Sequence, residues 1–268
     1  MNKLKEVLII IPAYNEAKTI SKVLDKLEQP EIADFADVLV MNDASSDGTQ
    51  HIVRQRNHPV VTHVFNLGYG SGLQVGFKYA RRRGYNYVIQ IDADGQHDVS
   101  NIPRIYEALK TADENGECPD IVIGSRFVEG AVSFPVPISK KIAFVLFRSI
   151  IKIATGKKIM DPTSGLQGLS KRTFSYYSQF KHFDDKYPDA NMLMQMLLLG
   201  YNVREIPAVM YARTNGESMH SGIIKPMIYM FRMMFSIIAV WLRVKVFKVD
   251  IENMKEIDEL DWIKKDSL

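Results

Sequence analysis

Short apolar runs alternate with helical patterns along the first half of the chain. Apolar residues three or four positions apart, such as Ile20, Val23 and Leu27, predict helices. Five runs rich in Val and Ile have the length of buried strands: 7–11, 38–41, 60–65, 87–91 and 121–124. This alternation of strands and helices predicts an α/β fold with a mostly parallel sheet and helices on both faces.

Polar segments follow the first four predicted strands, at the edge of the sheet where such folds bind ligands. They cover residues 12–16, 42–48, 66–70 and 92–97. Asp-Gly and Asn-Glu pairs are common in turns and helix caps, so any one of these segments alone indicates only a loop. Four of them at the same edge indicate a binding site.

Asp92 and Asp94 are the most specific pair of residues in these segments. They follow a buried strand directly and lie one residue apart, so both carboxylates can point to the same side. Two carboxylates form a site for a hard divalent cation, and a diphosphate would complete its coordination. The alternative is that one of them caps the helix that begins near Ser100 and the other is solvated.

Asp43 and Asp47 follow the neighbouring strand, where the base and ribose of a nucleotide would lie if its diphosphate is at Asp92 and Asp94. A carboxylate can accept hydrogen bonds from a base N–H or a ribose hydroxyl. Asp47 is equally well explained as the cap of the next helix. Gly68 and the glycines after it either contribute to the ligand site or allow a turn and a helix to pack closely.

Composition excludes several classes of protein. The chain has 268 residues, 46% hydrophobic and 24% charged, which is ordinary for a folded protein and excludes disorder, collagen and coiled coil. Its single cysteine, Cys118, cannot form an intramolecular disulfide, and the short apolar run after Glu6 does not suit a signal peptide. These features predict a cytoplasmic protein. A net charge of +3 is too small to indicate nucleic acid binding.

Five sequence motifs occur along the chain, at 11–16 (IPAYNE), 42–49 (NDASSDGT), 92–97 (DADGQH), 124–126 (GSR) and 161–165 (DPTSG). In this order they resemble the motifs of family 2 glycosyltransferases, in particular the branch of dolichyl-phosphate mannose synthases and bacterial polyprenyl-phosphate glycosyltransferases. The resemblance extends from Ile9 to about residue 220, roughly four fifths of the chain. It implies the GT-A fold, a Rossmann-like α/β architecture.

The resemblance also implies roles for individual residues. The residues implied to hold the nucleotide are Pro12, Tyr14, Glu16 and Asp43. Those implied to bind Mg²⁺ or Mn²⁺ are Asp92 and Asp94, with Gln96 as a further candidate ligand. Those implied to face the sugar or the acceptor phosphate are Ser125 and Arg126.

The need for a catalytic base depends on the acceptor. A sugar hydroxyl needs a base, whereas a lipid phosphate is already ionised at neutral pH and needs none. The resemblance places an acidic group near the acceptor, for which the candidates are Asp184, Asp185 and Asp189. Asp161 is a further candidate, although its motif also has the composition of a turn. His220 either approaches the metal or the diphosphate, or is an ordinary surface histidine.

Two segments combine apolar with basic residues and contain no acidic residue: 140–158 with six Lys or Arg, and 219–248 with five. The apolar part of the second, 227–242, is about sixteen residues long, fewer than the roughly 20 that cross a bilayer. We therefore expect amphipathic helices that lie in the interface of an anionic membrane; the alternative is core or oligomer helices. Residues 250–268 are acidic and either fold back on the basic helices or pair with another subunit.

The sequence thus predicts a GT-A glycosyltransferase domain, residues 1–220, followed by an amphipathic membrane-interface helix and an acidic tail, 221–268. The predicted function is metal-dependent, inverting transfer of a sugar from a UDP- or GDP-sugar to a polyprenyl phosphate, by an enzyme bound peripherally at the cytoplasmic face of the cell membrane. One alternative is transfer to a sugar hydroxyl of a lipid-linked glycan. An alternative from another class is a non-catalytic, membrane-associated nucleotide-binding scaffold, which the intact pair Asp92 and Asp94 disfavours. A nucleotidyltransferase would need a basic, Gly-rich loop after the first strand, which residues 12–16 lack.

Overall fold

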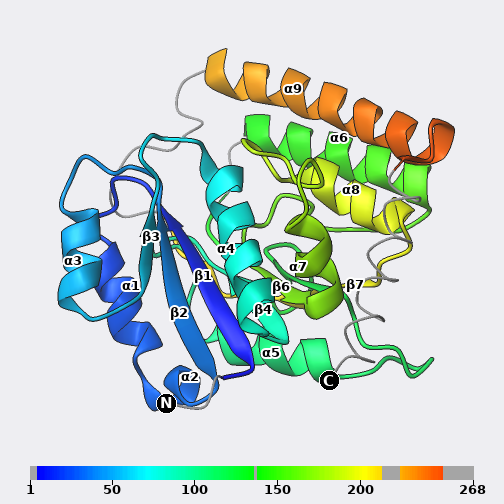
Figure 1. Cartoon of the computed structure of the whole chain (residues 1–268). Helices are drawn as coiled ribbons and strands as arrows, with labels where there is room; N and C mark the ends of the chain where they lie inside the picture. Colours follow the sequence, from blue (N-terminus) through cyan, green and yellow to red (C-terminus); the bar gives the residue numbers. More distant parts are fainter. Residues whose placement is uncertain (1–4, 136–137, 213–223, 250–268) are drawn as a thin grey trace.

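The computed structural model describes residues 5–135, 138–212 and 224–249. Within them, strands form one sheet in the order β3-β2-β1-β4-β6-β5-β7 (Figure 1). The strands are β1 (Val7–Ala13), β2 (Ala36–Asn42), β3 (Val60–Thr62), β4 (Tyr87–Gln90), β5 (Ile121–Ser125), β6 (Gln167–Ser170) and β7 (Val203–Pro207). Among these strands only β6 runs antiparallel to its neighbours, so the expected mostly parallel sheet is confirmed.

Helices cover both faces of the sheet, as expected, because alternate residues of a strand point to opposite faces. In β1, Leu8 and Ile10 belong to one apolar cluster, and Ile9 and Ile11 belong to the other. The helices that cover the first cluster are α4 (Tyr69–Arg83), α6 (Ile138–Thr155), α7 (Lys171–Tyr177), α8 (Ala190–Leu198) and α9 (Ile224–Trp241), which continues into the π-helical turn η1 (Leu242–Val246). Those that cover the second are α1 (Ile20–Leu27), α2 (Pro30–Ala33), α3 (Thr49–Gln55) and α5 (Asn101–Lys110).

The structure differs from the sequence prediction at the third strand, which was expected over 60–65. β3 has three residues, and the side chains of Val64 and Phe65 beyond it are 84% and 73% exposed. The N–H of His63 donates a last hydrogen bond to the carbonyl oxygen of Asn42, and the chain then turns toward α4. Strands β6 and β7 were not expected, because neither contains a continuous apolar run.

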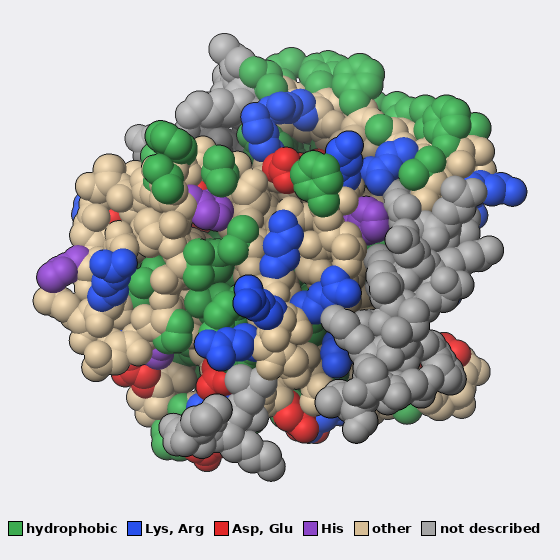
Figure 2. All heavy atoms as spheres, viewed as in Figure 1, with side chains coloured by type: hydrophobic (Ala, Val, Ile, Leu, Met, Phe, Trp, Pro, Cys, Tyr) green, Lys and Arg blue, Asp and Glu red, His purple; other side chains and the backbone are tan. Residues whose placement is uncertain are grey.

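Helix α9 forms an outer layer of the molecule next to α6 and α8 (Figure 1). Its inner face buries Met233, Ile237 and Val240 in the same apolar cluster as the sheet. Figure 2 shows hydrophobic side chains gathered over the outside of this helix, with Lys and Arg side chains beside them. The exposed apolar residues of α9 are Met227, Ile228, Phe231, Phe235, Ile238 and Trp241.

The helical segment Met227–Val246 is longer than the apolar stretch that the sequence suggested. By length and composition it is sufficient to cross a membrane, so length does not exclude a span, contrary to our expectation. Its packing against α8 leaves one face buried in protein and one face exposed. Residues 250–268, the predicted acidic tail, lie outside the described residues.

The loop formed by residues 183–189 packs directly against the start of α4, with backbone touching backbone. The N–H of Ser71 donates a hydrogen bond to the carbonyl oxygen of Asp185, at 2.9 Å. A Cβ added at Gly70 would lie 1.9 Å from the carbonyl oxygen of Asp184, so only glycine fits at this position. The close approach holds an acidic loop beside the carboxyl edge of the sheet.

Gly70→Ala is expected to displace this loop and to lower the free energy of unfolding by about 1–3 kcal/mol, because the added methyl group overlaps backbone atoms. Gly72→Ala, two residues further along the same helix, is the matched control. Its Cβ would lie 3.7 Å from that of Met41, an ordinary contact, and alanine favours helix by up to about 1 kcal/mol. Urea denaturation measures both variants, and equal stability of the two would contradict the packing described here.

Candidate active site

The loops that follow β1 and β2 are joined by hydrogen bonds between their backbones and side chains. The N–H of Asn15 donates to the hydroxyl of Ser45, and the N–H of Ser46 donates to the Asn15 side-chain oxygen, both at 2.9 Å. The N–H of Glu16 donates to the Thr49 hydroxyl, also at 2.9 Å. These bonds fix the segment in which the sequence predicted nucleotide contacts at Pro12, Tyr14 and Glu16, and they leave the Tyr14 side chain half exposed.

Asp47 also connects these two loops. One carboxylate oxygen accepts hydrogen bonds from the N–H and the hydroxyl of Thr49, and the other accepts from the N–H of Ala17. Burial would raise the pKa of Asp47, but the hydrogen bonds from Thr49 and Ala17 outweigh it and lower the pKa below its ordinary value. Asp47 therefore performs the capping role at the start of α3, and its predicted contact with the nucleotide stays a prediction.

Asp43 is buried and fixes the loop that follows β3. Its carboxylate accepts hydrogen bonds from the N–H groups of Leu67 and Gly68, both at 2.8 Å, and lies 2.8 Å from Nδ1 of His63. Asp43 and Gly68 are thus brought together, as the predicted nucleotide site requires. The Asp43 carboxylate thus orders the backbone of this loop. A hydrogen bond from a nucleotide base to Asp43 would come in addition to these backbone hydrogen bonds.

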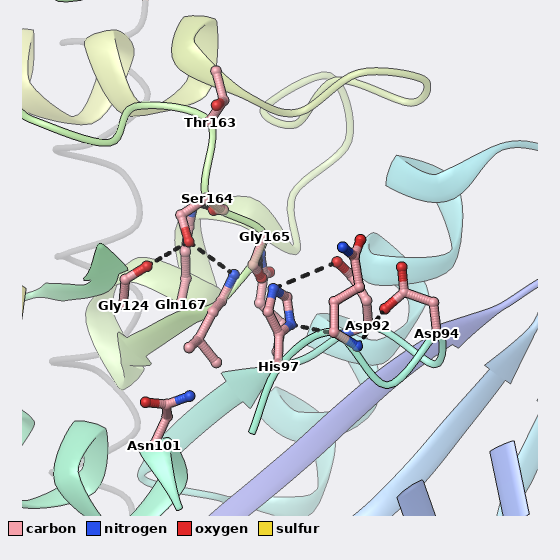
Figure 3. Close-up of polar contacts among 12 residues, drawn as sticks. Asp92, Asp94, His97, Asn101, Gly124, Thr163, Ser164, Gly165 and Gln167 are labelled. Atoms are coloured by element: carbon pink, nitrogen blue, oxygen red, sulfur yellow. Dashed lines mark hydrogen bonds and ion pairs between the residues drawn. The ribbon is translucent and has the colours of Figure 1, made fainter. Parts of the chain in front are cut away.

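Asp92 and Asp94 lie together on the loop after β4, with His97 beside Asp92 (Figure 3). The hydroxyl of Tyr69 donates a hydrogen bond to Asp92 Oδ1 at 3.0 Å. Burial, and then the neighbouring Asp92 carboxylate, raises the pKa of the Tyr69 phenol well above its ordinary value, so this group donates as a neutral hydroxyl. The N–H of Asp92 donates to Nδ1 of His97 at 3.2 Å, which fixes the backbone of the loop.

Gln96, the further candidate ligand, contacts a different part of the chain. Its side-chain N–H donates to the carbonyl oxygen of Tyr211 at 3.2 Å, and its backbone N–H donates to Asp94 Oδ1 at 3.0 Å. The side chain of Gln96 thus fastens the loop to the segment after β7. His220, the other candidate, lies outside the described residues.

The carboxylate pair fits a hard divalent cation, provided that the substrate supplies further oxygen ligands. Within residues 5–135, 138–212 and 224–249, no group of three or more His, Cys, Asp or Glu side chains is arranged to hold a metal ion by itself. Gly165 packs against the Asp92 carboxylate, since a Cβ at this position would lie only 3.0 Å from Asp92 Oδ2 (Figure 3). Carboxylate oxygens in a close-fitting cradle are suited to Mg²⁺ or Mn²⁺.

Arg126 is held in a fixed position by Asp161. The Arg126 guanidinium donates to both carboxylate oxygens of Asp161, at 2.8 and 2.6 Å, and also to the Thr163 hydroxyl at 3.0 Å. Asp161 has no exposed surface, and its own N–H donates to Glu205. This two-pronged ion pair orients Arg126, and the predicted role of Asp161 as a base stays a prediction.

Ser125 precedes Arg126 at the end of β5 and is fully buried. Its side-chain oxygen accepts a hydrogen bond from the N–H of Phe127 at 3.4 Å. The structure therefore does not bring this side chain to the surface of the site, and the predicted contact with the sugar stays untested.

Asp189, one of the three acidic candidates in residues 183–189, is hydrogen-bonded by a tyrosine of α9 and experiences the negative charge of Asp92. Burial raises the pKa of Asp189 to about 6; the hydrogen bond from Tyr229 opposes this rise, and the negative charges of Asp92 and Asp184 add to it. The Tyr229 hydroxyl, on α9, donates to Asp189 Oδ2 at 2.7 Å. A carboxyl with a pKa near neutrality is suited to accept a proton if the acceptor requires it.

Asp184 instead stabilises its own loop. Its Oδ1 accepts from the N–H groups of Lys186 and Tyr187, both at 2.9 Å, and its Oδ2 accepts from the side chain of Asn191 at 3.0 Å. Asp185 is exposed, and its carbonyl oxygen accepts the hydrogen bond from Ser71.

The fold and this edge of the sheet are those of a nucleotide-sugar-dependent transferase. Residues 8–177 match the family model described as Glycosyl transferase family 2, and the chain belongs to this family. It is therefore a glycosyltransferase, as the sequence predicted.

Two characterised relatives resemble the chain over most of its length. It is 33% identical over 225 residues to the undecaprenyl-phosphate mannosyltransferase of Micrococcus luteus, covering 81% of this chain and 88% of that protein. It is 25% identical over 227 residues to the polyprenol monophosphomannose synthase of Mycolicibacterium smegmatis, covering 81% and 82%. These relatives belong to the branch that the sequence motifs indicated.

A solved structure confirms the GT-A fold. Glucosyl-3-phosphoglycerate synthase from Mycobacterium tuberculosis, in complex with Mn²⁺, uridine diphosphate and phosphoglyceric acid, superposes with a TM-score of 0.62. The two are 17% identical, and the match covers 89% of this chain and 78% of that chain. At this identity the likeness establishes the shared fold.

Sequence reasoning missed three residues of the site, namely Tyr69, Glu205 and Tyr229. Glu205 accepts hydrogen bonds from the N–H groups of Met160 and Asp161, yet it lies in a strand that the apolar pattern did not reveal. Tyr69 and Tyr229 each donate to a carboxylate more than 20 residues away, at Asp92 and Asp189. No local signal in the sequence points to such distant pairs.

Asp92→Asn and Asp94→Asn are each expected to lower the transfer rate by roughly a thousandfold or more, because each removes the charge of a metal ligand and keeps its shape. The fold should remain intact. Transfer assays with and without Mn²⁺ measure the loss, and the thermal midpoint in the absence of metal serves as the folding control. Activity within tenfold of the parent, or activity independent of divalent ions, would contradict the assignment.

Proposed function

We propose that this enzyme transfers a sugar from a nucleoside diphosphate sugar to a polyprenyl phosphate, with inversion at the anomeric carbon and with a divalent metal ion. The observation that carries the proposal is the convergence, at one edge of the sheet, of the Asp92 and Asp94 pair with the ion pair of Arg126 and Asp161. The segment 161–165 connects the two pairs, because Asp161 at its start binds Arg126 and Gly165 at its end lies against the Asp92 carboxylate.

The donor binds along the loops that follow β1, β2 and β4. We assign the base and ribose to the segment fixed by Asn15, Asp43 and Asp47, and the diphosphate to the end of β4. Mg²⁺ or Mn²⁺ held by Asp92 and Asp94 supplies the positive charge that neutralises the departing diphosphate. The solved structure of similar fold that contains Mn²⁺ and uridine diphosphate supports a divalent metal ion and a nucleoside diphosphate as ligands, and we propose a UDP- or GDP-sugar as donor.

The acceptor approaches from the opposite side, where Arg126 and α9 lie. Asp161 and Thr163 hold the Arg126 guanidinium in place, so that it can meet an incoming anion without reorganising. An ionised phosphate oxygen attacks the anomeric carbon from the face opposite the diphosphate and needs no base. The names of the two polyprenyl-phosphate-dependent relatives support this acceptor.

A pocket between α9 and the 183–187 loop supports a lipid acceptor. Its volume is about 560 Å³, and five of its lining residues are aromatic or apolar: Phe183, Tyr187, Tyr229, Met233 and Phe235. The others are polar or charged: Asp184, Asp185, Lys186, Arg232 and Ser236. The Tyr229 hydroxyl connects the pocket to Asp189. The aromatic and apolar part of the lining suits an isoprenoid chain.

The enzyme is proposed to bind the cytoplasmic face of a membrane peripherally, through α6 and α9. Exposed apolar residues lie on both helices, including Ile142 and Ile153 on α6 and Phe231 and Phe235 on α9. Among the described residues of these helices the charged side chains are all basic, which suits anionic lipid head groups. Because α9 packs against α8 along one face, interfacial binding is favoured over a span.

With a short polyprenyl phosphate as acceptor, we expect product from one nucleotide sugar in the presence of Mn²⁺. Asp189→Asn should then retain activity within about tenfold, because a phosphate needs no deprotonation; a sugar hydroxyl would make the loss roughly a hundredfold or more. As a control for the donor site, the rise in thermal midpoint on adding nucleoside diphosphate and Mn²⁺ should be the same in the variant and the parent. Turnover on a glycosylated lipid alone, with no product from any polyprenyl phosphate, would favour the glycan acceptor, and the absence of all donor turnover would favour a scaffold.

The membrane proposal predicts a dependence on charge that sedimentation with lipid vesicles can measure. Replacing Lys141, Arg232 and Lys245 by Gln should weaken binding to anionic vesicles by about 1 kcal/mol each, or roughly fivefold per charge. The control removes Lys22 and Arg54, exposed residues of α1 and α3 on the other face of the sheet. An equal loss of vesicle binding per charge removed in the two sets would contradict a specific membrane-binding face, and release only by detergent would indicate a spanning helix.

A further inference from the structure

Arg126 and Arg148 differ in whether a carboxylate pairs with their positive charge. Arg126 forms a two-pronged ion pair with the buried carboxylate of Asp161, so most of its charge is compensated within the protein. Arg126 can still orient an anion, but the pair as a unit carries little net charge. A phosphate that binds here needs positive charge from another residue.

Arg148, on α6, lies against the same aromatic ring as Arg126. The Arg148 guanidinium carbon lies 4.5 Å from the centroid of the Phe127 ring, and that of Arg126 lies 5.3 Å from it. Both guanidinium groups thus contact the same ring by cation–π interaction. Their shared ring places Arg148 beside the acceptor side of the site.

Arg148 forms no direct ion pair within the part of the chain that the structure describes. No carboxylate of residues 5–135, 138–212 and 224–249 forms an ion pair with Arg148, and its buried Nε has no hydrogen-bond partner among them. Burial lowers the pKa of Arg148, which Asp161 and Glu205 oppose and Arg126 reinforces. An arginine nevertheless stays charged at neutral pH, and a desolvated donor without a partner costs free energy until an acceptor arrives.

We infer that Arg148 binds the terminal phosphate of the acceptor and provides the charge that Arg126 cannot. This inference rests on the proposed function and names a residue of its acceptor site that the sequence motifs do not contain. A phosphate monoester carries nearly two negative charges at neutral pH and three acceptor oxygens. The planar fork of an arginine can donate to two of these oxygens at once, and such binding would supply the missing partner of Nε.

The location of Arg148 also fits a phosphate attached to a lipid. Helix α6 exposes Ile142, Val145 and Ile153 on the face proposed to contact the membrane. Phe147, the neighbour of Arg148, is buried and packs edge-on against Tyr229, a residue of the pocket beside α9. A phosphate at Arg148 would therefore lie between the membrane-facing surface and the donor site.

The test compares Arg148→Gln with Lys152→Gln in neutral detergent micelles, where the charge of a membrane plays no part. Lys152 is exposed and lies one helical turn further along α6, so both variants lose one positive charge from the same helix. The probes are farnesyl phosphate, farnesol and inorganic phosphate, each measured by binding. Arg148→Gln should bind farnesyl phosphate roughly ten- to a hundredfold more weakly than the parent, with farnesol unchanged, whereas Lys152→Gln should bind both like the parent.

Two further measurements separate a binding role from a structural one. If Arg148 were needed mainly for packing, its removal would lower the thermal midpoint and weaken binding of nucleoside diphosphate with Mn²⁺; we expect neither, because the desolvated charge itself costs stability. Arg148→Lys, which keeps the charge but not the fork, should recover part of the affinity.

The outcomes distinguish this inference from the proposed function. Weaker binding of both phosphates in Arg148→Gln supports a general phosphate site, and weaker binding of farnesyl phosphate alone supports a site for the lipid head group. Normal binding in this variant, or an equal loss in Lys152→Gln, overturns the role of Arg148 even if the enzyme glycosylates polyprenyl phosphates. If the parent binds neither phosphate, both the role of Arg148 and the proposed acceptor are wrong.

Discussion

The site depends first on the parallel register of β1, β2 and β4. β1 pairs with β2 through Ala13 and Asn42, and with β4 through Ile10 and Gln90, so the three strands end at one edge of the sheet. Their following loops must then satisfy exposed backbone N–H groups at the same place. Asn15, Asp43 and Asp47 do so across the loops, and the same geometry delivers Asp92 and Asp94 next to them.

This edge concentrates negative charge before any cation binds. Burial raises the pKa of Asp189 to about 6, and the charges of Asp92 and Asp184 add to this rise. Arg126 offsets part of it but is itself engaged by Asp161. In the proposed function, Asp92 and Asp94 meet a divalent cation and Arg126 meets the anionic acceptor.

Close backbone approach gives the site its shape. Gly70 allows the 183–189 loop to touch α4, and Gly165 leaves room for the Asp92 carboxylate. Tyr229 and Ser236, both on α9, then bind Asp189 and Asn191 from the outside. Helix α9 thus has an inner face that holds the 183–189 loop and an outer face with exposed apolar side chains, so the order of this loop and the surface proposed to contact a membrane belong to the same helix.

The sequence by itself determined the α/β class, five of the parallel strands, though not the end of the third, and the order of the motifs. Apolar periodicity reports burial and short motifs report local turn chemistry. It did not determine which carboxylates are free to act. Asp161, Asp184, Asp185 and Asp189 were all candidates for a base, and only the tertiary structure shows that Asp161 is paired with Arg126, 35 positions away. Likewise, β6, β7 and the partner of Asp189 on α9 follow from pairings between distant segments. Hydrogen bonding and desolvation decide what a carboxylate can do, and both are set by neighbours that are close in space but remote in the chain.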